Sequence, residues 1–124
     1  SWLVGNADMH LKNYSLYAPE VGNYQLTPAY DLLSTTLVLP EDAEELALTL
    51  CGKKRKLTAK HFLAAMESSG IQQRVARNLF LRFQRVLPKW EGCIADSFIP
   101  DAMKSAYIAL IRQRIALLMD HLLE

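Results

Sequence analysis

The stretch of sequence that decides the fold of this chain is GNADMHLKN at residues 5–13, which PAYD follows at residues 28–31. Asp8 stands five residues before Asn13, and a second acid, Asp31, comes after a short excursion. Phosphoryl transfer uses such a set, because one carboxylate meets the substrate hydroxyl while an amide and another carboxylate hold magnesium against the nucleotide phosphates. The spacing therefore predicts a catalytic residue, Asp8, and a metal-binding pair, Asn13 and Asp31.

Each of these three residues also has a purely structural interpretation, because Asp and Asn are common in turns and helix caps. Their joint order and interval favour the functional one. Two more side chains of the loop can carry charge. Lys12 could meet the transferred phosphate as a point charge or stay solvated, and His10 could contact the nucleotide or, as we favour, brace the loop by hydrogen bonds.

The composition is that of an ordinary globular domain. The 124 residues are 51% hydrophobic and 22% charged, and the formal net charge of +1 gives no overall field toward nucleic acid or membrane. The apolar runs are too short to span a bilayer. Two cysteines, Cys51 and Cys93, do not make a disulfide framework. We therefore expect a cytoplasmic protein with free thiols and no membrane partner.

A basic run, Lys53-Lys54-Arg55-Lys56, invites a nucleic-acid interpretation. No aromatic interleaving, zinc spacing or helix-turn-helix pattern accompanies it. A solvated loop is therefore the favoured interpretation.

A β-hairpin is predicted directly after the loop. The β-prone segments 14–17 and 24–27 flank Pro19 and the pair Gly22-Asn23, which are strong turn formers. Such a hairpin would carry the chain from the loop back to the second acid. The segment 46–50 is ambiguous, because acidic residues before it favour a helix while its alternation favours a strand.

From Thr58 onward the pattern is helical. Thr58 is a good N-cap, and Gly70 stands where a helix ends. Pro88 is expected to end the second helix, and Pro100 to open the last one. The apolar stripes of these two helices consist of Ala76, Leu79, Phe80, Phe83, Val86 and Leu87, and of Ile108, Ile111, Ile115, Leu118 and Leu122.

The predicted fold is mainly α, with a small β-hairpin near the N-terminus and a bundle of three or four helices, like the helical C-terminal lobe of a kinase. Residues 1–40 would hold the catalytic and metal-binding loops with the hairpin. Residues 57–124 would form the helical bundle.

Two segments, VGNADMHLKNYS at residues 4–15 and YQLTPAYDLLS at residues 24–34, resemble the C-terminal lobe of HipA-like serine/threonine kinases. These are toxins of bacterial toxin–antitoxin systems, with a fold related to eukaryotic protein kinases, whose catalytic loop has the same Asp-to-Asn interval. A looser similarity continues through residues 46–54 and into the helices. The whole chain, residues 1–124, is therefore expected to be such a lobe.

The resemblance implies that Asp8 is the catalytic aspartate and that Asn13 and Asp31 bind magnesium. The family transfers the γ-phosphoryl group of ATP to Ser or Thr, and characterised members act on aminoacyl-tRNA synthetases. A DNA-binding antitoxin of the HipB type usually restrains them, so DNA would be contacted only through that partner. The residues implied to line the nucleotide phosphates are His10, Lys12, Asn13, Tyr30 and Asp31.

The chain begins inside an apolar run, Ser1-Trp2-Leu3-Val4, which suggests an element that started upstream. A working kinase also needs a loop over the phosphates and a lysine that holds them, both on an N-terminal lobe. We expect that lobe upstream of Ser1. The isolated chain is therefore predicted to have little or no kinase activity.

Two alternatives stay open. A small-molecule phosphotransferase of the same superfamily would also place an Asp and an Asn at this interval. A helical interaction module would use the polar loop only as scaffold. Asp8→Asn and Asp31→Asn would then change neither nucleotide binding nor toxicity in the intact protein.

Overall fold

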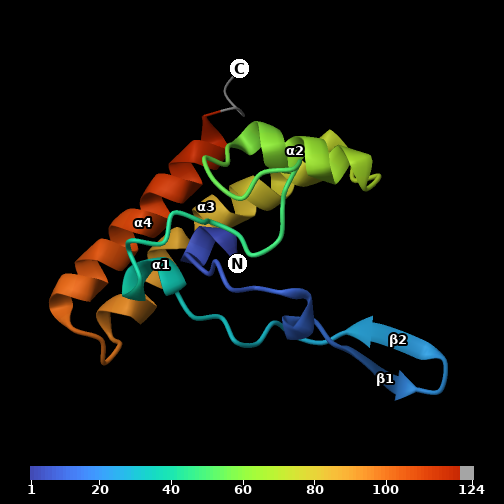
Figure 1. The fold of residues 1–124 in the computed structure, drawn as a ribbon, viewed down its shortest axis with the longest axis horizontal. Helices are drawn as coiled ribbons and strands as arrows, with labels where there is room; N and C mark the ends of the chain where they lie inside the picture. Colours follow the sequence, from blue (N-terminus) through green and yellow to red (C-terminus); the bar gives the residue numbers. More distant parts are fainter. Residues whose placement is uncertain (121–124) are drawn as a thin grey trace.

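A computed structural model of the chain describes residues 1–120 and shows a helical body from which a β-hairpin extends (Figure 1). The helices are α1 (Thr35–Val38), α2 (Ala59–Ser68), α3 (Gln73–Ala95) and α4 (Asp101–Met119). They follow two short 3₁₀ helices, η1 (Trp2–Val4) and η2 (Leu11–Asn13), and the strands β1 (Leu16–Glu20) and β2 (Asn23–Leu26). The predicted mainly α fold with a small β-hairpin near the N-terminus is confirmed.

The two strands pair antiparallel, from Leu16 opposite Leu26 to Glu20 opposite Asn23. Pro19 was predicted to lie in the turn, and that prediction is wrong, because Pro19 is part of β1. It lies where the register between the strands is irregular. Proline has no N–H to donate, so a strand tolerates it at such an irregularity.

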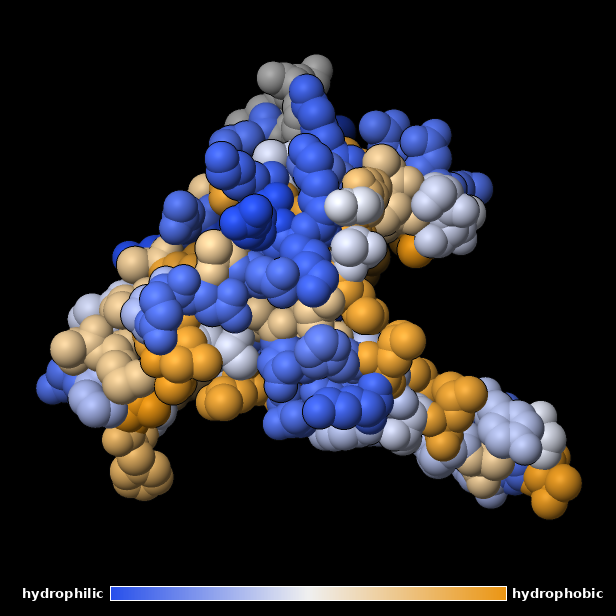
Figure 2. Space-filling view, in the orientation of Figure 1, coloured by the Kyte–Doolittle hydropathy of each residue, from blue (hydrophilic) through white to orange (hydrophobic). Residues whose placement is uncertain are grey.

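The hairpin is an exposed arm. Figure 2 shows apolar side chains along it, beyond the main body of the molecule. A two-stranded hairpin is marginally stable at best in water. Within the fold, the hairpin returns the chain from the first loop to the segment that holds Asp31. The exposed apolar side chains of the arm are Leu16, Tyr17, Val21, Tyr24 and Leu26.

The ambiguous segment 46–50 forms neither a helix nor a regular strand. Its last residue, Leu50, makes an isolated antiparallel bridge with Lys53. The basic run beyond it is largely exposed, as the solvated-loop interpretation requires. Within the run, Lys54 forms an ion pair with Glu44 at 3.1 Å.

The boundaries of α2 follow the predicted signals. Thr58 is the N-cap residue, and its backbone N–H donates to Nδ1 of His61 at 3.1 Å. This contact is part of a capping box, and it satisfies a backbone N–H that has no acceptor within the helix. Gly70, with a φ of +77°, follows the C-cap residue Ser69 and turns the chain away.

Helix α3 does not end at Pro88, contrary to the prediction, and continues to Ala95. Proline inside a helix costs about 3 kcal/mol, because it removes a hydrogen bond and crowds the preceding turn. Two apolar side chains beyond Pro88 offset that cost. Ile94 is buried in the core, and the ring of Trp90 lies 6.0 Å from that of Phe83.

The core lies where α3 and α4 pack together, with η1 against α4 (Figure 1). The stripe of α4 is directed inward, with Ile111, Ile115 and Leu118 buried. Leu122, also assigned to that stripe, lies outside the described residues. On α3, Ala76 and Phe80 are buried, and the other predicted members of the stripe are partly buried. Both helical stripes therefore face the core over the described residues.

A charged side chain lies within this core. Arg114 is only 6% exposed, and its guanidinium lies 5.1 Å from the ring centroid of Trp2. It donates to the backbone carbonyl of Trp2, whose indole N–H donates to Glu45 at 2.6 Å. Burial lowers the pKa of the Arg114 guanidinium, and the charge of Glu45 opposes that shift. These contacts hold η1, and hence the loop that follows it, against α4.

Cys51 and Cys93 are exposed and unpaired, as predicted. Within residues 1–120 every helix is too short or too polar to cross a membrane.

Candidate functional site

The structure brings Asn13 and Asp31 together, beside the backbone of Asp8. The side-chain amide of Asn13 donates from Nδ2 to the backbone carbonyl of Asp8 at 3.1 Å. The same nitrogen lies 3.3 Å from Oδ2 of Asp31. Asn13 is buried, and none of the described residues donates to its Oδ1. That oxygen is therefore available to a cation.

These two side chains suit magnesium. The ion takes hard oxygen ligands and usually only one or two from protein, leaving the rest to water and phosphate. An amide oxygen from Asn13 and a carboxylate from Asp31 match that donor set. Residues 1–120 hold no group of three or more His, Cys, Asp or Glu side chains placed to enclose a metal. An ion held by this pair would therefore keep open positions for phosphate.

The carboxylate of Asp8 points to solvent and has one ionisable neighbour within reach. Its Oδ1 lies 3.1 Å from Nε2 of His10, and the two side chains are 62% and 49% exposed. A substrate hydroxyl can approach such an exposed carboxylate directly. His10 lies against the predicted catalytic aspartate, a contact that suits the favoured bracing role without testing it.

The remaining predicted residues lie at the edge of the loop. Tyr30 approaches Ser15 with an oxygen–oxygen distance of 2.6 Å and donates to the backbone carbonyl of Lys12 at 3.3 Å. These contacts fasten the segment before Asp31 to the end of the first loop. The side chain of Lys12 is exposed and makes no hydrogen bond to a described residue, so it is free to meet an anion.

A buried amide that the sequence analysis left without a role lies at the centre of the site. Asn6 is 1% exposed and accepts a hydrogen bond from the backbone N–H of Asp8 at 2.9 Å. Its Nδ2 donates to the backbone carbonyl of Asp31, also at 2.9 Å. The residue type was visible in the motif. Its burial was not, because burial depends on the second segment that packs against it.

Two threonines at the start of α1 were also missed. Thr35 accepts from the backbone N–H of Ala7 at 2.9 Å and donates to the carbonyl of Gly5 at 3.2 Å. Thr36 donates to that same carbonyl at 3.1 Å. The first loop is thus held by the segment that follows Asp31, and no local pattern announces such long-range contacts.

The backbone of Asp31 is unusual, with a φ of +54°. A residue other than glycine in this left-handed region costs energy, although Asp and Asn tolerate it better than most. Such strained residues gather at functional sites, where the surrounding structure holds them. The Asn6 hydrogen bond to the Asp31 carbonyl is one of the contacts that does so here.

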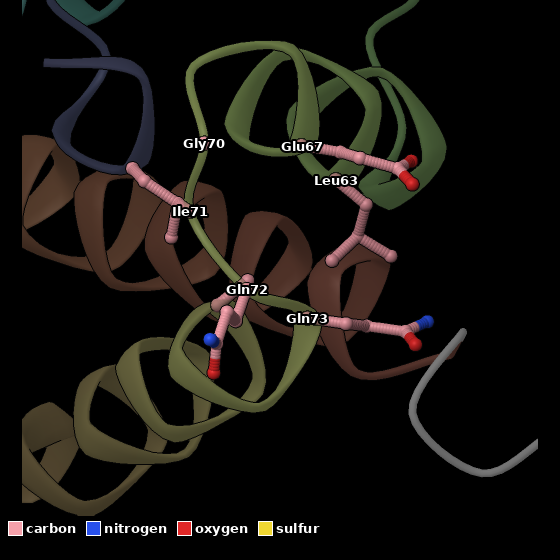
Figure 3. A pocket seen from close by; sticks show the side chains of 7 residues that line it. Leu63, Glu67, Gly70, Ile71, Gln72 and Gln73 are labelled. Atoms are coloured by element: carbon pink, nitrogen blue, oxygen red, sulfur yellow. The ribbon is translucent and has the colours of Figure 1, made fainter.

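The cavity beside the two loops is small. A cavity of about 60 Å³ adjoins it, lined by Met9, Asn13, Tyr14 and residues 26–29. Cavities that enclose small ligands measure about 300–1,000 Å³. A larger cavity of about 410 Å³ lies between α2 and α3, where Ile71, Gln72 and Gln73 line it (Figure 3). None of its lining residues comes from the loops that carry Asp8 and Asp31. The cavity between α2 and α3 is therefore separate from the candidate site.

The mainly α fold with a small β-hairpin agrees with the family to which sequence comparison assigns the chain. The sequence profile of the HipA-like C-terminal domain matches residues 1–90. The chain belongs to this family, so the resemblance noted in the sequence is confirmed.

Two relatives are named as kinases. The chain is 38% identical over 99 residues to a Sinorhizobium fredii protein named "Putative kinase Y4dM", a match that covers 74% of this chain and 23% of the relative. It is 28% identical over 134 aligned positions to a Haemophilus influenzae protein named "Putative kinase", covering 95% of this chain and 39% of the relative. The chain thus spans well under half the length of either relative.

Proposed function

We propose that the protein carrying this chain is an ATP-dependent kinase and that this chain supplies its catalytic and metal-binding loops. The observation that carries the proposal is the meeting of three predicted residues. Asn13 contacts both the Asp31 carboxylate and the backbone of Asp8, while the Asp8 carboxylate stays open to solvent. The names of the relatives support a kinase-related activity.

Each residue has a defined task in the proposed transfer. The substrate hydroxyl oxygen forms a bond to the γ-phosphorus as the bond to the ADP oxygen breaks, and Asp8 orients the hydroxyl and takes its proton. Asn13 and Asp31 would hold magnesium, which supplies positive charge to the phosphates when bound. Lys12 adds a further positive charge near the transferred group.

We further propose that the acceptor is a Ser or Thr of a protein. Membership of the HipA-like family, which the segment TPAYDL at residues 27–32 favours, supports this choice over a small-molecule substrate. On the same basis an aminoacyl-tRNA synthetase is a candidate substrate and a HipB-like DNA-binding protein a candidate antitoxin. A cytoplasmic location would suit both partners.

The isolated chain is expected to lack turnover. A kinase needs a loop and a lysine over the phosphates, and the cavity at the site is far too small to enclose a nucleotide. A further lobe must cover ATP for transfer to be efficient. Robust phosphorylation by residues 1–124 alone would contradict this part of the proposal.

The test incubates the intact protein with magnesium and γ-labelled ATP, beside Asp8→Asn and a matched control, Asp96→Asn. Asp96 is an exposed aspartate at the end of α3, away from the loops. We expect label on protein Ser or Thr with the wild type and Asp96→Asn, and its loss with Asp8→Asn. Label on a small molecule would favour the small-molecule phosphotransferase instead.

A helical interaction module is the remaining candidate. The exposed apolar arm of β1 and β2 is the observation that favours it, since such an arm suits contact with another surface. No label in any variant, with no rise in melting temperature when ATP and magnesium are added, would establish this alternative over the kinase.

A further inference from the structure

We propose that Asn6 is a positioning residue that sets the distance between the catalytic aspartate, Asp8, and the metal-binding aspartate, Asp31. This inference rests on the proposed function and deepens it. Asn6 itself is too deeply buried to touch substrate or nucleotide, at 1% exposed. Its effect must therefore pass through the two backbones that it holds.

The contacts of Asn6 join the two segments directly. Its Oδ1 accepts from the backbone N–H of Asp8, and its Nδ2 donates to the backbone carbonyl of Asp31, both at 2.9 Å. Asn13 joins the same two aspartates from its side, through the Asp8 carbonyl and the Asp31 carboxylate. Two amides thus bridge one pair of aspartates, and Asn6 is the bridge that uses backbone atoms on both sides.

The chemistry of the position requires a carboxamide. One side chain must accept from an N–H and donate to a carbonyl at the same time, which Asn does with its two ends. An aspartate there would keep the acceptor but lose the donor. It would also bring a buried negative charge against the Asp31 carbonyl, which is costly without a partner.

The threonine contacts cannot replace this bridge. Thr35 and Thr36 bind the backbone of Gly5 and Ala7, before Asp8 is reached. They hold the loop against the start of α1 and touch neither aspartate. Thr36→Val is therefore a matched control, since it removes one loop contact of similar length and leaves the Asn6 bridge intact.

Loss of the Asn6 bridge should displace the catalytic groups and lower the rate, rather than lower the affinity for the substrate. A displacement of about 1 Å in a catalytic group can cost on the order of 100-fold in rate. We expect Asn6→Ala and Asn6→Asp to lower kcat by about 10–100-fold and to raise the magnesium concentration needed for half-maximal rate. KM for the acceptor protein should change little.

The experiment measures these constants on the intact protein for the wild type, Asn6→Ala, Asn6→Asp and Thr36→Val. Binding of Mn²⁺, followed by its electron paramagnetic resonance signal without nucleotide, is the readout that does not depend on turnover. Melting temperature is recorded for each variant. Asn6→Asp keeps nearly the same volume but buries a charge, whereas Asn6→Ala leaves a cavity, so the two variants remove the bridge in different ways and either one that folds tests the inference.

The expected result is weaker Mn²⁺ binding and a lower kcat in both Asn6 variants. Thr36→Val should lower the melting temperature only slightly, because the backbone N–H of Thr36 still donates to the Gly5 carbonyl, and should keep both constants within about twofold. Unchanged constants in the folded Asn6 variants, or equal losses in Thr36→Val, would overturn the positioning role while leaving the kinase in place. A wild type with no Asp8-dependent transfer would instead overturn the proposed function, and the positioning role with it.

Discussion

Nδ2 of Asn13 lies 3.3 Å from Oδ2 of Asp31, although 18 residues separate the two along the chain. The hairpin of β1 and β2 accounts for this, because an antiparallel excursion returns the chain to its starting point. The exposed apolar arm therefore has a structural consequence at the site. It brings a loop residue and a residue beyond the hairpin within hydrogen-bonding distance of each other.

Asn13→Ala should weaken metal binding, because it removes the free amide oxygen that completes the pair with Asp31. A loss of roughly tenfold or more in Mn²⁺ affinity is expected, as seen when residues around metal sites are removed. Titration of the intact protein with Mn²⁺ measures it. Asn78→Ala, at an exposed position of α3, is the control and should bind as the wild type does.

Gly5→Ala should destabilise the fold by more than about 1 kcal/mol, since alanine is strained at positive φ and the site is crowded. Gly5 has a φ of +74°, and an added Cβ would lie 2.6 Å from Oγ of Ser34 and 2.8 Å from Cδ2 of Leu110. Gly70→Ala separates the two causes, because Gly70 has a φ of +77° and open space around it. Urea unfolding of the chain checks the difference, and equal losses would show that crowding at Gly5 is unimportant.

Arg114→Met should cost about 1.5–3 kcal/mol, the usual contribution of a hydrogen bond to a charged group. Methionine fills similar space but cannot donate to the carbonyl of Trp2, which the guanidinium now does. The substitution also removes the positive charge that faces Glu45. Thermal unfolding followed by tryptophan fluorescence reports the change, and Arg82→Met on the exposed side of α3 should leave the transition nearly unaltered.

An ion pair between α3 and α4 should make stability depend on pH in the acid range. Nε of Arg112 lies 2.6 Å from Oε1 of Glu91. The hydrogen bond from Arg112 holds the pKa of Glu91 below its ordinary value of 4.5. The stabilisation that this ion pair contributes is therefore present above pH 4.5 and is lost as the pH falls through the lowered pKa of Glu91.

Arg112→Gln should reveal that contribution. The variant should unfold at lower urea concentration than the wild type near neutral pH, and the two midpoints should converge once Glu91 is protonated. A difference in midpoint that stays constant down to acid pH would show that the pair does not act through the charge of Glu91.

Much of the fold could be predicted because its signals are local. The capping residue Thr58, the glycine at position 70 and the stripe of α4 each depend on neighbours a few residues away. The predictions that failed also rested on local signals, but packing between distant segments outweighed those signals. Pro88 is a helix breaker by its own chemistry, yet burial of Ile94 beyond it keeps α3 continuous to Ala95.

The candidate site, too, could be predicted from the sequence only in part. The interval from Asp8 to Asn13 and the later Asp31 are properties of the sequence, so the residue types that phosphoryl transfer needs could be named from it. The buried bridge of Asn6 and the threonine contacts could not, because each joins segments 25 or more residues apart. Only the folded chain decides which of many polar side chains meet.

The sequence by itself determined α2, α4, the presence of the hairpin and the family, because periodicity, turn residues and motif spacing are properties of the chain. Tertiary structure alone decided that Arg114 lies in the core against Trp2, and that Asn6 links Asp8 to Asp31. The reason is physical. A buried polar group is stable only when every partner is in place, and those partners are brought together by packing between distant segments.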